Sequence, residues 1–244
     1  MNFTIHHLGT CTSTNDVARE MARGGAPAGT VVTADEQTAG RGTKGRSWHS
    51  VRGKGLYVSV LVRPRVPEIS LLPLAAGLAA RDAVEISSGL APALRWPNDL
   101  VWEGRKLGGI LCESAFWGNR PDYAILGTGL NVDQAEEDFP ADLRPAAVSI
   151  RAASGRSPDR EALLSALLSE TARRVAAVEE GHGAEIIRDF EARSEFRPGD
   201  PVAVLVGEAA VRGEYRGLDA EGALLLAGPG GVRSFSVAEI VKVL

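Results

Sequence analysis

The sequence predicts an α+β fold in two parts. Short segments of alternating apolar and polar residues predict strands as far as residue 130. Residues 159–193 carry leucines and a valine at helical spacing. From residue 196 onward, short β-prone segments separated by Gly and Pro turns are typical of a small five-stranded barrel of SH3-like type. We therefore predict a large mixed domain over residues 1–193 and a small C-terminal β-domain over residues 194–244.

The elements follow in order from these local patterns. In the large domain, strands are predicted at residues 3–8, 30–34 and 56–62, and as an antiparallel meander at residues 93–96, 101–102, 106–113 and 123–130. Helices are predicted from the capping cluster at 12–16 to residue 23, over 68–86, and over 159–193 with a break at 181–183. In the small domain, strands are predicted at residues 202–206, 211–218, 223–226 and 232–235.

The composition is that of an ordinary globular protein. The chain has 244 residues, of which 44% are hydrophobic and 24% charged, with a formal net charge of −4. The N-terminus has no basic segment followed by an apolar core, and no apolar run reaches the roughly 20 residues that span a bilayer. We therefore expect a cytoplasmic protein that does not enter a membrane. Its two cysteines, Cys11 and Cys112, lack metal-ligand spacing.

Residues 37–48 form a basic, glycine-rich segment inside this acidic chain. The segment carries Arg41, Lys44 and Arg46 together with Trp48, and no Asp or Glu occurs between residues 36 and 68. Glycines let backbone N–H groups approach an anion, the cations neutralise it, and the indole can stack on a planar base. A local positive field in an acidic protein indicates a discrete phosphate or carboxylate ligand rather than a long polyanion.

The segment also matches the dinucleotide-binding pattern G-x-G-x-x-G at residues 40–45. The context excludes that interpretation, because such a turn must open into an apolar-periodic helix and be followed about 20 residues later by an acidic residue. Here Arg46, Ser47 and Trp48 follow instead, and the downstream region is a strand. A kinase interpretation fails as well, since no His-Arg-Asp or Asp-Phe-Gly element follows.

A second group of polar residues lies in the meander. The Pro97-Asn98-Asp99 turn ends one strand and Lys106 begins the next after a tight reversal, which predicts that Asn98, Asp99 and Lys106 lie near one another. Paired glycines at 108–109 often mark the close approach of a ligand or of another backbone. A third element, residues 127–131, repeats glycines at a strand end before Asn131.

These three elements, in this order and spacing, resemble the bacterial biotin protein ligases. The resemblance rests on Ser13-Thr14-Asn15, Gln37, Gly40-Arg41-Gly42, Trp48, Trp96-Pro97-Asn98-Asp99, Lys106-Leu107-Gly108-Gly109-Ile110-Leu111 and Gly129-Leu130-Asn131. It implies a catalytic domain related to class II aminoacyl-tRNA synthetases, a mixed sheet flanked by helices, followed by an SH3-like domain. Because a strand begins at residue 3, we expect the monofunctional type that lacks the DNA-binding domain of the repressor members.

The resemblance implies a two-step reaction: ATP activates biotin as biotinyl-5′-AMP, and biotin is then transferred to a lysine of a biotin carboxyl carrier protein. Lys106 and Arg41 would be the catalytic residues, with Lys106 bridging the biotin carboxylate and the α-phosphate. The biotin site would be lined by Ser13, Thr14, Asn15, Gln37, Gly40, Arg41, Gly42, Thr43 and Lys106. The ATP site would be lined by Arg46, Trp48, Asn98 and Asn131.

Further expectations concern the metal, the partners and one departure from the family pattern. ATP and Mg²⁺ are expected as co-substrate and ion, with biotin as substrate and no tightly bound prosthetic group. Asp99 either orients Lys106 or holds the Mg²⁺. The carrier is that of acetyl-CoA carboxylase or a similar enzyme, no DNA is bound, and a homodimer is expected. Many family members carry Arg where this chain has Thr43, so Lys44 or Arg46 is predicted to retain the adenylate.

Three other functions stay open as alternatives. A lipoate or octanoate protein ligase or transferase has a related fold and also modifies a carrier lysine, although the Gly-Arg-Gly loop with Trp48 favours biotin. A protein that binds RNA or DNA through the basic loop is opposed by the net charge of −4 and by the lack of interleaved basic and aromatic residues in the small domain. A biotin-sensing regulator without catalysis would need a DNA-binding domain.

Overall fold

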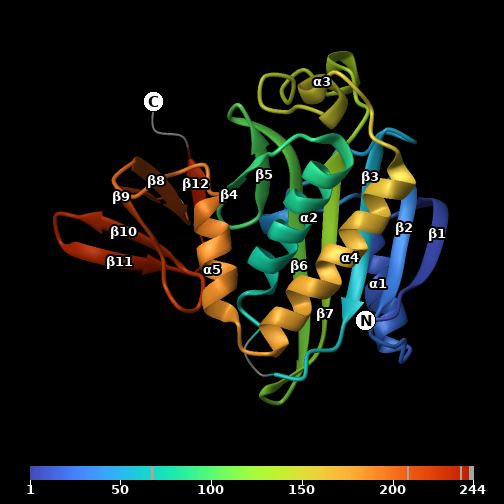
Figure 1. The fold of residues 1–244 in the computed structure, drawn as a ribbon, viewed down its shortest axis with the longest axis horizontal. Coiled ribbons are helices and arrows are strands. Elements are labelled where there is room, and N and C mark those ends of the chain that lie inside the picture. Colours follow the sequence, from blue (N-terminus) through green and yellow to red (C-terminus); the bar gives the residue numbers. More distant parts are fainter. Residues whose placement is uncertain (67–68, 208, 237, 242–244) are drawn as a thin grey trace.

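A mixed sheet of seven strands forms the centre of the larger domain (Figure 1). The computed structural model describes residues 1–66, 69–207, 209–236 and 238–241. The strands are β1 (Thr4–Cys11), β2 (Thr30–Gln37), β3 (Gly55–Val62), β4 (Ala93–Arg95), β5 (Asp99–Trp102), β6 (Arg105–Trp117) and β7 (Arg120–Asn131). Their order is β1-β2-β3-β7-β6-β5-β4, in which β1 and β2 are parallel and the other neighbours antiparallel. The predicted meander and mixed sheet are thereby confirmed.

Helices cover both faces of this sheet. They are α1 (Thr14–Arg23), α2 (Leu72–Ser88), the short α3 (Ile150–Ser154), α4 (Arg160–Glu179) and α5 (Gly183–Ala192). Helix α1 packs on β2, β3 and β7, while α2 packs on β6 and β7 from the other side and is itself covered by α4 (Figure 1). The predicted break between α4 and α5 is confirmed. Glu68, where the sequence predicts α2 to begin, lies outside the described residues.

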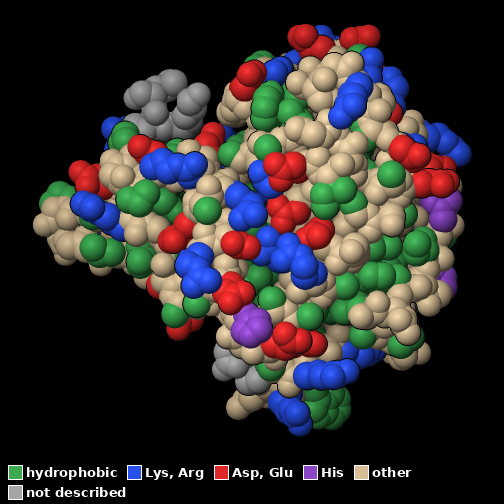
Figure 2. Space-filling model, in the orientation of Figure 1, with side chains coloured by type: hydrophobic (Ala, Val, Ile, Leu, Met, Phe, Trp, Pro, Cys, Tyr) green, Lys and Arg blue, Asp and Glu red, His purple; other side chains and the backbone are tan. Residues whose placement is uncertain are grey.

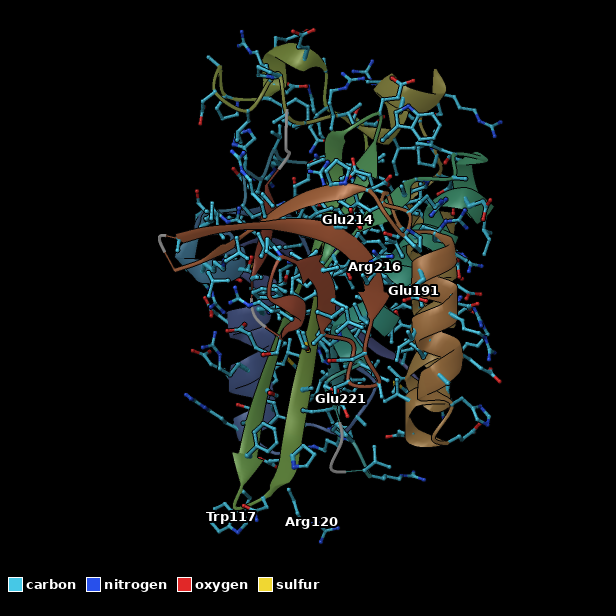
Figure 3. The ribbon with its side chains drawn as sticks, turned by 90° about the vertical axis from the view of Figure 1, so that its left-hand side faces the viewer. Trp117, Arg120, Glu191, Glu214, Arg216 and Glu221 are labelled. Atoms are coloured by element: carbon cyan, nitrogen blue, oxygen red, sulfur yellow. The ribbon has the colours of Figure 1, made fainter. Side chains whose placement is uncertain are left out.

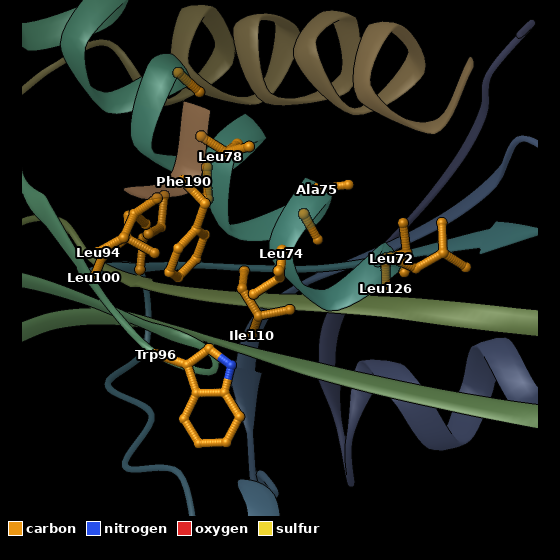
Figure 4. Packing of buried hydrophobic residues seen from close by; sticks show 14 of the residues in the cluster. Leu72, Leu74, Ala75, Leu78, Leu94, Trp96, Leu100, Ile110, Leu126 and Phe190 are labelled. Atoms are coloured by element: carbon orange, nitrogen blue, oxygen red, sulfur yellow. The ribbon is translucent and has the colours of Figure 1, made fainter. Parts of the chain in front are cut away.

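Alternate residues along the strands belong to different hydrophobic clusters, one on each face of the sheet. Val31 and Val60 belong to the large cluster beneath α2 and α4, whereas their neighbours Val32 and Leu61 belong to a small cluster with Ala18 of α1. Successive side chains on a strand point to opposite faces, so a strand covered on both sides is buried along its whole length. This explains why every position of β3 is buried. Figure 4 shows α2 residues facing Ile110 and Leu126 in the large cluster.

An ion network joins α2, α4 and α5. The buried Asp82 of α2 lies 2.8 Å from the Arg174 guanidinium of α4 and 3.5 Å from that of Arg193, just after α5. Arg174 also contacts Asp189 of α5. A buried arginine left without its carboxylates would cost several kcal/mol. The network therefore fixes α5 against the helical layer, and Figure 2 shows acidic and basic side chains interleaved over this face.

The C-terminal region forms a separate five-stranded antiparallel sheet. Its strands are β8 (Pro201–Val206), β9 (Ala209–Leu218), β10 (Leu224–Gly228), β11 (Gly231–Phe235) and β12 (Glu239–Val241), in the order β11-β10-β9-β8-β12. The four predicted strands are confirmed and β12 is the fifth. The domain boundary at residue 193 stays a prediction, and Leu244, its expected end, lies outside the described residues. Ser194 bridges to Leu94 of β4, so the segment that precedes β8 contacts the large sheet.

The hairpin of β6 and β7 is longer than predicted. The sequence predicts strands at 106–113 and 123–130, but pairing continues to Trp117 and Arg120 at the tip of the hairpin (Figure 3). Polar residues such as Ser114 and Asp122 interrupt the apolar alternation on which the prediction depends, while the backbone ladder does not require it. Among the described residues, no helix is long and apolar enough to span a membrane.

Candidate active site

A pocket of about 220 Å³ opens over β6 and β7, beside the basic loop. It brings together the predicted residues Ser13, Thr14, Asn15, Gln37, Arg41, Gly42, Thr43, Arg46, Trp48, Asn98, Lys106 and Asn131. Gly40 and Asp99 lie next to lining residues but do not line the pocket themselves. Twelve residues from five separate segments of the chain therefore line one pocket.

The floor of the pocket is built from glycines on paired strands. Gly109 of β6 lies directly opposite Gly129 of β7. A Cβ atom at Gly129 would lie 2.8 Å from the Trp48 indole, and one at Gly109 would lie 3.3 Å from it. A Cβ essentially never approaches to 2.8 Å and 3.3 Å is already tight, so the glycines allow the indole to lie close against the sheet. The close approach that the sequence predicts at residues 108–109 is made within this chain: the Gly129 carbonyl and the Leu130 side chain approach Gly108, and the Lys106 and Trp48 side chains approach Gly109.

Lys106 stands at the edge of this floor. Its Nζ lies 2.7 Å from Oδ1 of Asp99 and 5.5 Å from the centroid of the Trp48 ring. The β5–β6 hairpin turns at Glu103 and Gly104, both with positive φ, and places Asp99 opposite Gly109 in the ladder. A tight two-residue turn of this kind sets the register of both strands. The predicted proximity of Asp99 and Lys106 is confirmed.

Asn98 is held by the neighbouring strand. Its Nδ2 donates a hydrogen bond of 2.7 Å to the carbonyl of Ile110, and its own carbonyl accepts one from the Ile110 N–H at 2.8 Å. These two bonds attach the Pro97-Asn98-Asp99 turn to β6. Asn131 similarly donates to the carbonyl of Val148 at 3.2 Å. Both amides therefore organise the pocket wall through the backbone.

The basic loop is a small closed turn. Gly42 N–H donates to the Arg46 carbonyl at 2.7 Å, and Trp48 N–H donates to the Gly40 carbonyl at 2.8 Å. A Cβ at Gly40 would lie 2.8 Å from the Trp48 carbonyl, so only glycine permits this closure. Lys44 sits at the tip with φ of 56°, a conformation uncommon for residues with a side chain. The guanidinium of Arg46 folds back to the Thr43 hydroxyl at 3.1 Å.

Arg41 points away from the other loop cations and is paired with two carboxylates. Its Nη1 and Nη2 donate to Glu113 of β6 at 3.0 and 2.7 Å, and Nη2 also donates to Asp16 of α1 at 2.8 Å. The Arg41 Nε is buried and has no hydrogen-bond partner. Burial raises the pKa of Glu113, but hydrogen bonds from Arg41 and Asn15 outweigh it, so the pKa is lowered overall. The Glu113 hydrogen bond is also the main reason that the pKa of Arg41 is raised.

A largely buried polar cluster lines another part of the pocket. Gln37 Oε1 accepts from the backbone N–H of Thr14 at 2.9 Å and from its hydroxyl at 3.1 Å. The Ser59 hydroxyl lies 2.8 Å from Thr14 Oγ1 and 2.6 Å from Asn15 Oδ1, one of which accepts its proton. Asn15 Nδ2 donates to the Leu111 carbonyl and to Glu113. Ser13 precedes α1, yet its hydroxyl makes no capping hydrogen bond.

Several lining residues are not among the predicted site residues. Phe139, Leu143, Ala146 and Ala147 come from an irregular segment between β7 and α3 that carries no recognisable pattern. Lys54 holds this segment by a contact of 2.6 Å to Asp138, and that hydrogen bond is the main cause of the lowered Asp138 pKa. Glu113, Asp16 and Ser59 form the supports behind the lining and were also missed. In the sequence they read as ordinary solvated or strand residues.

The sequence predicts that a Mg²⁺ ion accompanies ATP, and the side chains around the pocket decide how such an ion could be held. In the described part of the chain, no group of three or more His, Cys, Asp or Glu side chains is arranged to hold a metal ion. Asp99 is engaged by Lys106. A Mg²⁺ ion bound with a nucleotide typically takes one or two carboxylates and otherwise phosphate and water oxygens. The residues thus fit an ion that arrives with a polyphosphate better than a dedicated protein site.

Comparisons with known protein families match both parts of the chain. The Biotin/lipoate A/B protein ligase family matches residues 8–131, and the biotin protein ligase C-terminal domain matches residues 199–243. A biotin-(acetyl-CoA-carboxylase) ligase of Paracoccus denitrificans is 34% identical and covers 96% of this chain and 98% of its own length. The corresponding ligase of Mycobacterium tuberculosis is 37% identical over 88% of this chain and 79% of its own length.

Solved structures resemble the fold over nearly its whole length. The biotin protein ligase of Aquifex aeolicus in complex with biotin and ATP has a TM-score of 0.85 and 28% identity, covering 98% of this chain and 97% of that one. The Leishmania major enzyme in complex with biotinyl-5-AMP has a TM-score of 0.65 and 29% identity, covering 98% of this chain and 99% of that one. Two solved structures of this fold thus contain biotin, one together with ATP and the other as biotinyl-5-AMP.

Proposed function

This chain belongs to the biotin protein ligases of the Biotin/lipoate A/B protein ligase family, and we propose from that premise how its own residues perform the reaction. The substrates are biotin, ATP and a lysine of a biotin carboxyl carrier protein. The single observation that carries the proposal is the position of Lys106: its ammonium lies between the Trp48 ring and Asp99, at the edge of the pocket that also contains the polar cluster.

The first step joins two anions. An oxygen of the biotin carboxylate attacks the α-phosphorus of ATP, the bond from that phosphorus to the bridging oxygen breaks, and pyrophosphate leaves. Repulsion between carboxylate and phosphate costs a few kcal/mol per close contact at an effective dielectric of about 20. Lys106 is proposed to bridge both groups and offset that repulsion as charge develops on the phosphate. The contact of 2.7 Å to Asp99 supports an orienting role for that carboxylate.

The remaining predicted residues are assigned by their place around the pocket. Thr14, Gln37 and Asn15 form the polar end and are proposed to surround the ureido ring, with the Ser13 hydroxyl available as an additional donor. Arg41 is proposed to donate a hydrogen bond to the biotin carboxylate, and later to the adenylate phosphate, through its Nε–H, which has no hydrogen-bond partner in the chain. Backbone groups of Gly40, Gly42 and Thr43 would complete this site.

The nucleotide is proposed to bind at the Trp48 end. One face of the indole lies on the glycine floor, which leaves the other to stack on adenine. Arg46 would contact phosphate oxygens, while Asn98 and Asn131 shape the wall through their bonds to Ile110 and Val148. Mg²⁺ is proposed to enter with the phosphates, supplying further charge neutralisation.

In the second step the uncharged amine of the carrier lysine attacks the acyl carbon of the adenylate. The carbon–nitrogen bond forms, the bond to the phosphate oxygen breaks, AMP leaves and the amine loses a proton. No enzyme nucleophile is needed, because the mixed anhydride is already activated. A cytoplasmic location, the absence of DNA binding and a homodimer remain predictions from the sequence.

A biotin-dependent exchange of labelled pyrophosphate into ATP tests this proposal. We expect exchange with biotin and none with lipoate or octanoate, since an apolar dithiolane or alkyl chain offers no hydrogen-bonding group to the polar end of the pocket, where Thr14 is buried and Gln37 half-buried. Exchange with lipoate but not with biotin would assign the chain to the lipoate branch of the family.

A further inference from the structure

Glu113 occupies a junction behind the pocket that none of the proposed substrate contacts explains. It lies on β6 with its side chain 26% exposed, and it accepts hydrogen bonds from Nη1 and Nη2 of Arg41 and from Nδ2 of Asn15. Arg41 belongs to the basic loop and Asn15 to the first turn of α1. One carboxylate thus ties together two segments that are separate in the sequence and that both line the pocket.

The connection continues from Asn15 to the polar end of the site. Asn15 Oδ1 lies 2.6 Å from the Ser59 hydroxyl, which lies 2.8 Å from Thr14 Oγ1. Thr14 in turn donates to Gln37. Each of Thr14, Asn15 and Ser59 is at most 4% exposed, so this chain of polar contacts is closed to water over most of its length. Networks of this kind are rigid when every member is satisfied.

The pairing also determines which donor of Arg41 is available. A guanidinium is planar, and a bidentate contact with a carboxylate fixes its plane. Glu113 and Asp16 engage Nη1 and Nη2, so Nε is the buried nitrogen that is left without a hydrogen-bond partner. If Glu113 were removed, Asp16 alone would hold Arg41 by one nitrogen and the plane could rotate.

We propose that Glu113 is a positioning residue of the biotin site: it holds Arg41 and Asn15 in one geometry, so that the loop cation and the polar end of the pocket form a single preorganised surface. The proposal rests on the proposed function. It predicts that removing the Glu113 charge weakens biotin binding. A purely electrostatic view predicts the opposite, because the stronger positive field would improve the binding of an anionic substrate.

The test uses Glu113→Gln in the full chain, with biotin-dependent pyrophosphate exchange and a separate measurement of the biotin Kd by calorimetry. Loss of a charge-assisted bidentate pair predicts a biotin KM and Kd raised roughly tenfold, with the KM for ATP changed less than about twofold. Glu113→Asp keeps the charge on a shorter arm and should fall between wild type and Glu113→Gln. In an Arg41→Lys background, which cannot pair bidentately, Glu113→Gln should have little further effect.

The matched control is Glu195→Gln. Glu195 makes a bidentate contact with Arg95 at 2.6 and 2.8 Å, is 22% exposed, and does not line the pocket. Its replacement should lower the unfolding temperature while leaving the biotin KM unchanged.

A biotin KM for Glu113→Gln that is unchanged or lower than wild type overturns the proposal, as does an equal rise in the KM values for biotin and ATP. Should Glu113→Gln fail to fold, the same criteria apply to Glu113→Asp. Failure of the wild-type chain to exchange with biotin would instead reject the proposed function.

Discussion

The indole Nε1 of Trp96 donates a hydrogen bond of 2.9 Å to the backbone carbonyl of Gly222. Trp96 directly precedes the Pro97-Asn98-Asp99 turn of the site and is 3% exposed, whereas Gly222 belongs to a turn of the small domain. Gly222 has φ of +81°, and a Cβ there would lie 2.8 Å from side chains of Leu71 and Leu74. Figure 4 shows the Trp96 indole among the buried cluster that also includes Leu74. The small domain thus supports the strand from which Asp99 reaches Lys106.

Trp96→Phe removes this bond and leaves a buried carbonyl without its donor. We expect a loss of about 1–2 kcal/mol in the free energy of unfolding, measured by urea denaturation. Trp102→Phe on β5 controls for replacing an indole by a phenyl ring. A Trp96→Phe chain as stable as wild type would mean that the Gly222 carbonyl finds another partner.

Lys106→Ala should abolish pyrophosphate exchange while leaving the far-ultraviolet circular dichroism unchanged. The ammonium is the group proposed to meet both reacting anions, and removing one such stabilising contact typically costs about 10²- to 10³-fold in kcat. Asp99→Asn keeps the size of the partner of Lys106 and should produce a smaller loss. Near-normal exchange by Lys106→Ala would assign the catalytic cation to another residue.

Gly129→Ala places a methyl group where the Trp48 indole now lies. A contact of 2.8 Å must be relieved by moving the ring, so we expect a higher KM for ATP and a smaller change in the KM for biotin. Gly230→Ala is the control, because a Cβ there has no atom within 4 Å. Tryptophan fluorescence on titration with ATP measures the effect. An unaltered ATP titration would argue against adenine stacking on Trp48.

The choice between Lys44 and Arg46 as the residue that retains the adenylate is also open to measurement. Arg46 lines the pocket and contacts Thr43, whereas Lys44 does not line it. We therefore expect faster release of biotinyl-5′-AMP from Arg46→Ala than from Lys44→Ala in a rapid-dilution assay. Faster release from Lys44→Ala would reverse this assignment.

Acid should weaken the Glu113 junction. Because the folded-state pKa of Glu113 is lowered from 4.5, its contribution to stability is fully present above the ordinary carboxyl pKa and is lost as the pH falls through the lowered value. The difference in unfolding free energy between wild type and Glu113→Gln should therefore be constant from pH 7 to about pH 5 and shrink below about pH 4. Denaturant titrations at several pH values measure it, and a pH-independent difference would contradict the assignment.

The parts of the site that sequence predicts are those set by local geometry. Asp99 and Lys106 come within 2.7 Å of each other because they lie on the two strands of one tight hairpin, which the turn residues between them predict. The glycine-rich loop can also be predicted from its local sequence, because its closure requires glycine at residue 40. The strand pattern likewise predicted the meander and the small β-domain.

The supports behind the site could not be derived in this way. Glu113 contacts Arg41 because β6 lies beside the loop in the folded sheet. The residues around Glu113 and Arg41 in the sequence contain no pattern that predicts this pair. Phe139 and Leu143 line the pocket from an irregular segment with no periodicity. The long hairpin tip was missed because backbone pairing continues after the apolar pattern has ended.

The sheet order places β7 between β6, its neighbour in sequence, and β3, which comes much earlier in the chain. The β6–β7 hairpin can form locally, whereas β3 must close a long loop before it pairs, a step that is slow in folding. The basic loop lies between β2 and β3, so we expect it to reach Lys106 only after that closure. Biotin and ATP therefore bind only the folded chain. A ligand present at a hundredfold excess over its Kd adds about 2.7 kcal/mol to the free energy of unfolding. Vitamin supply would in this way influence how much of the enzyme persists in the cell, not only how fast it turns over.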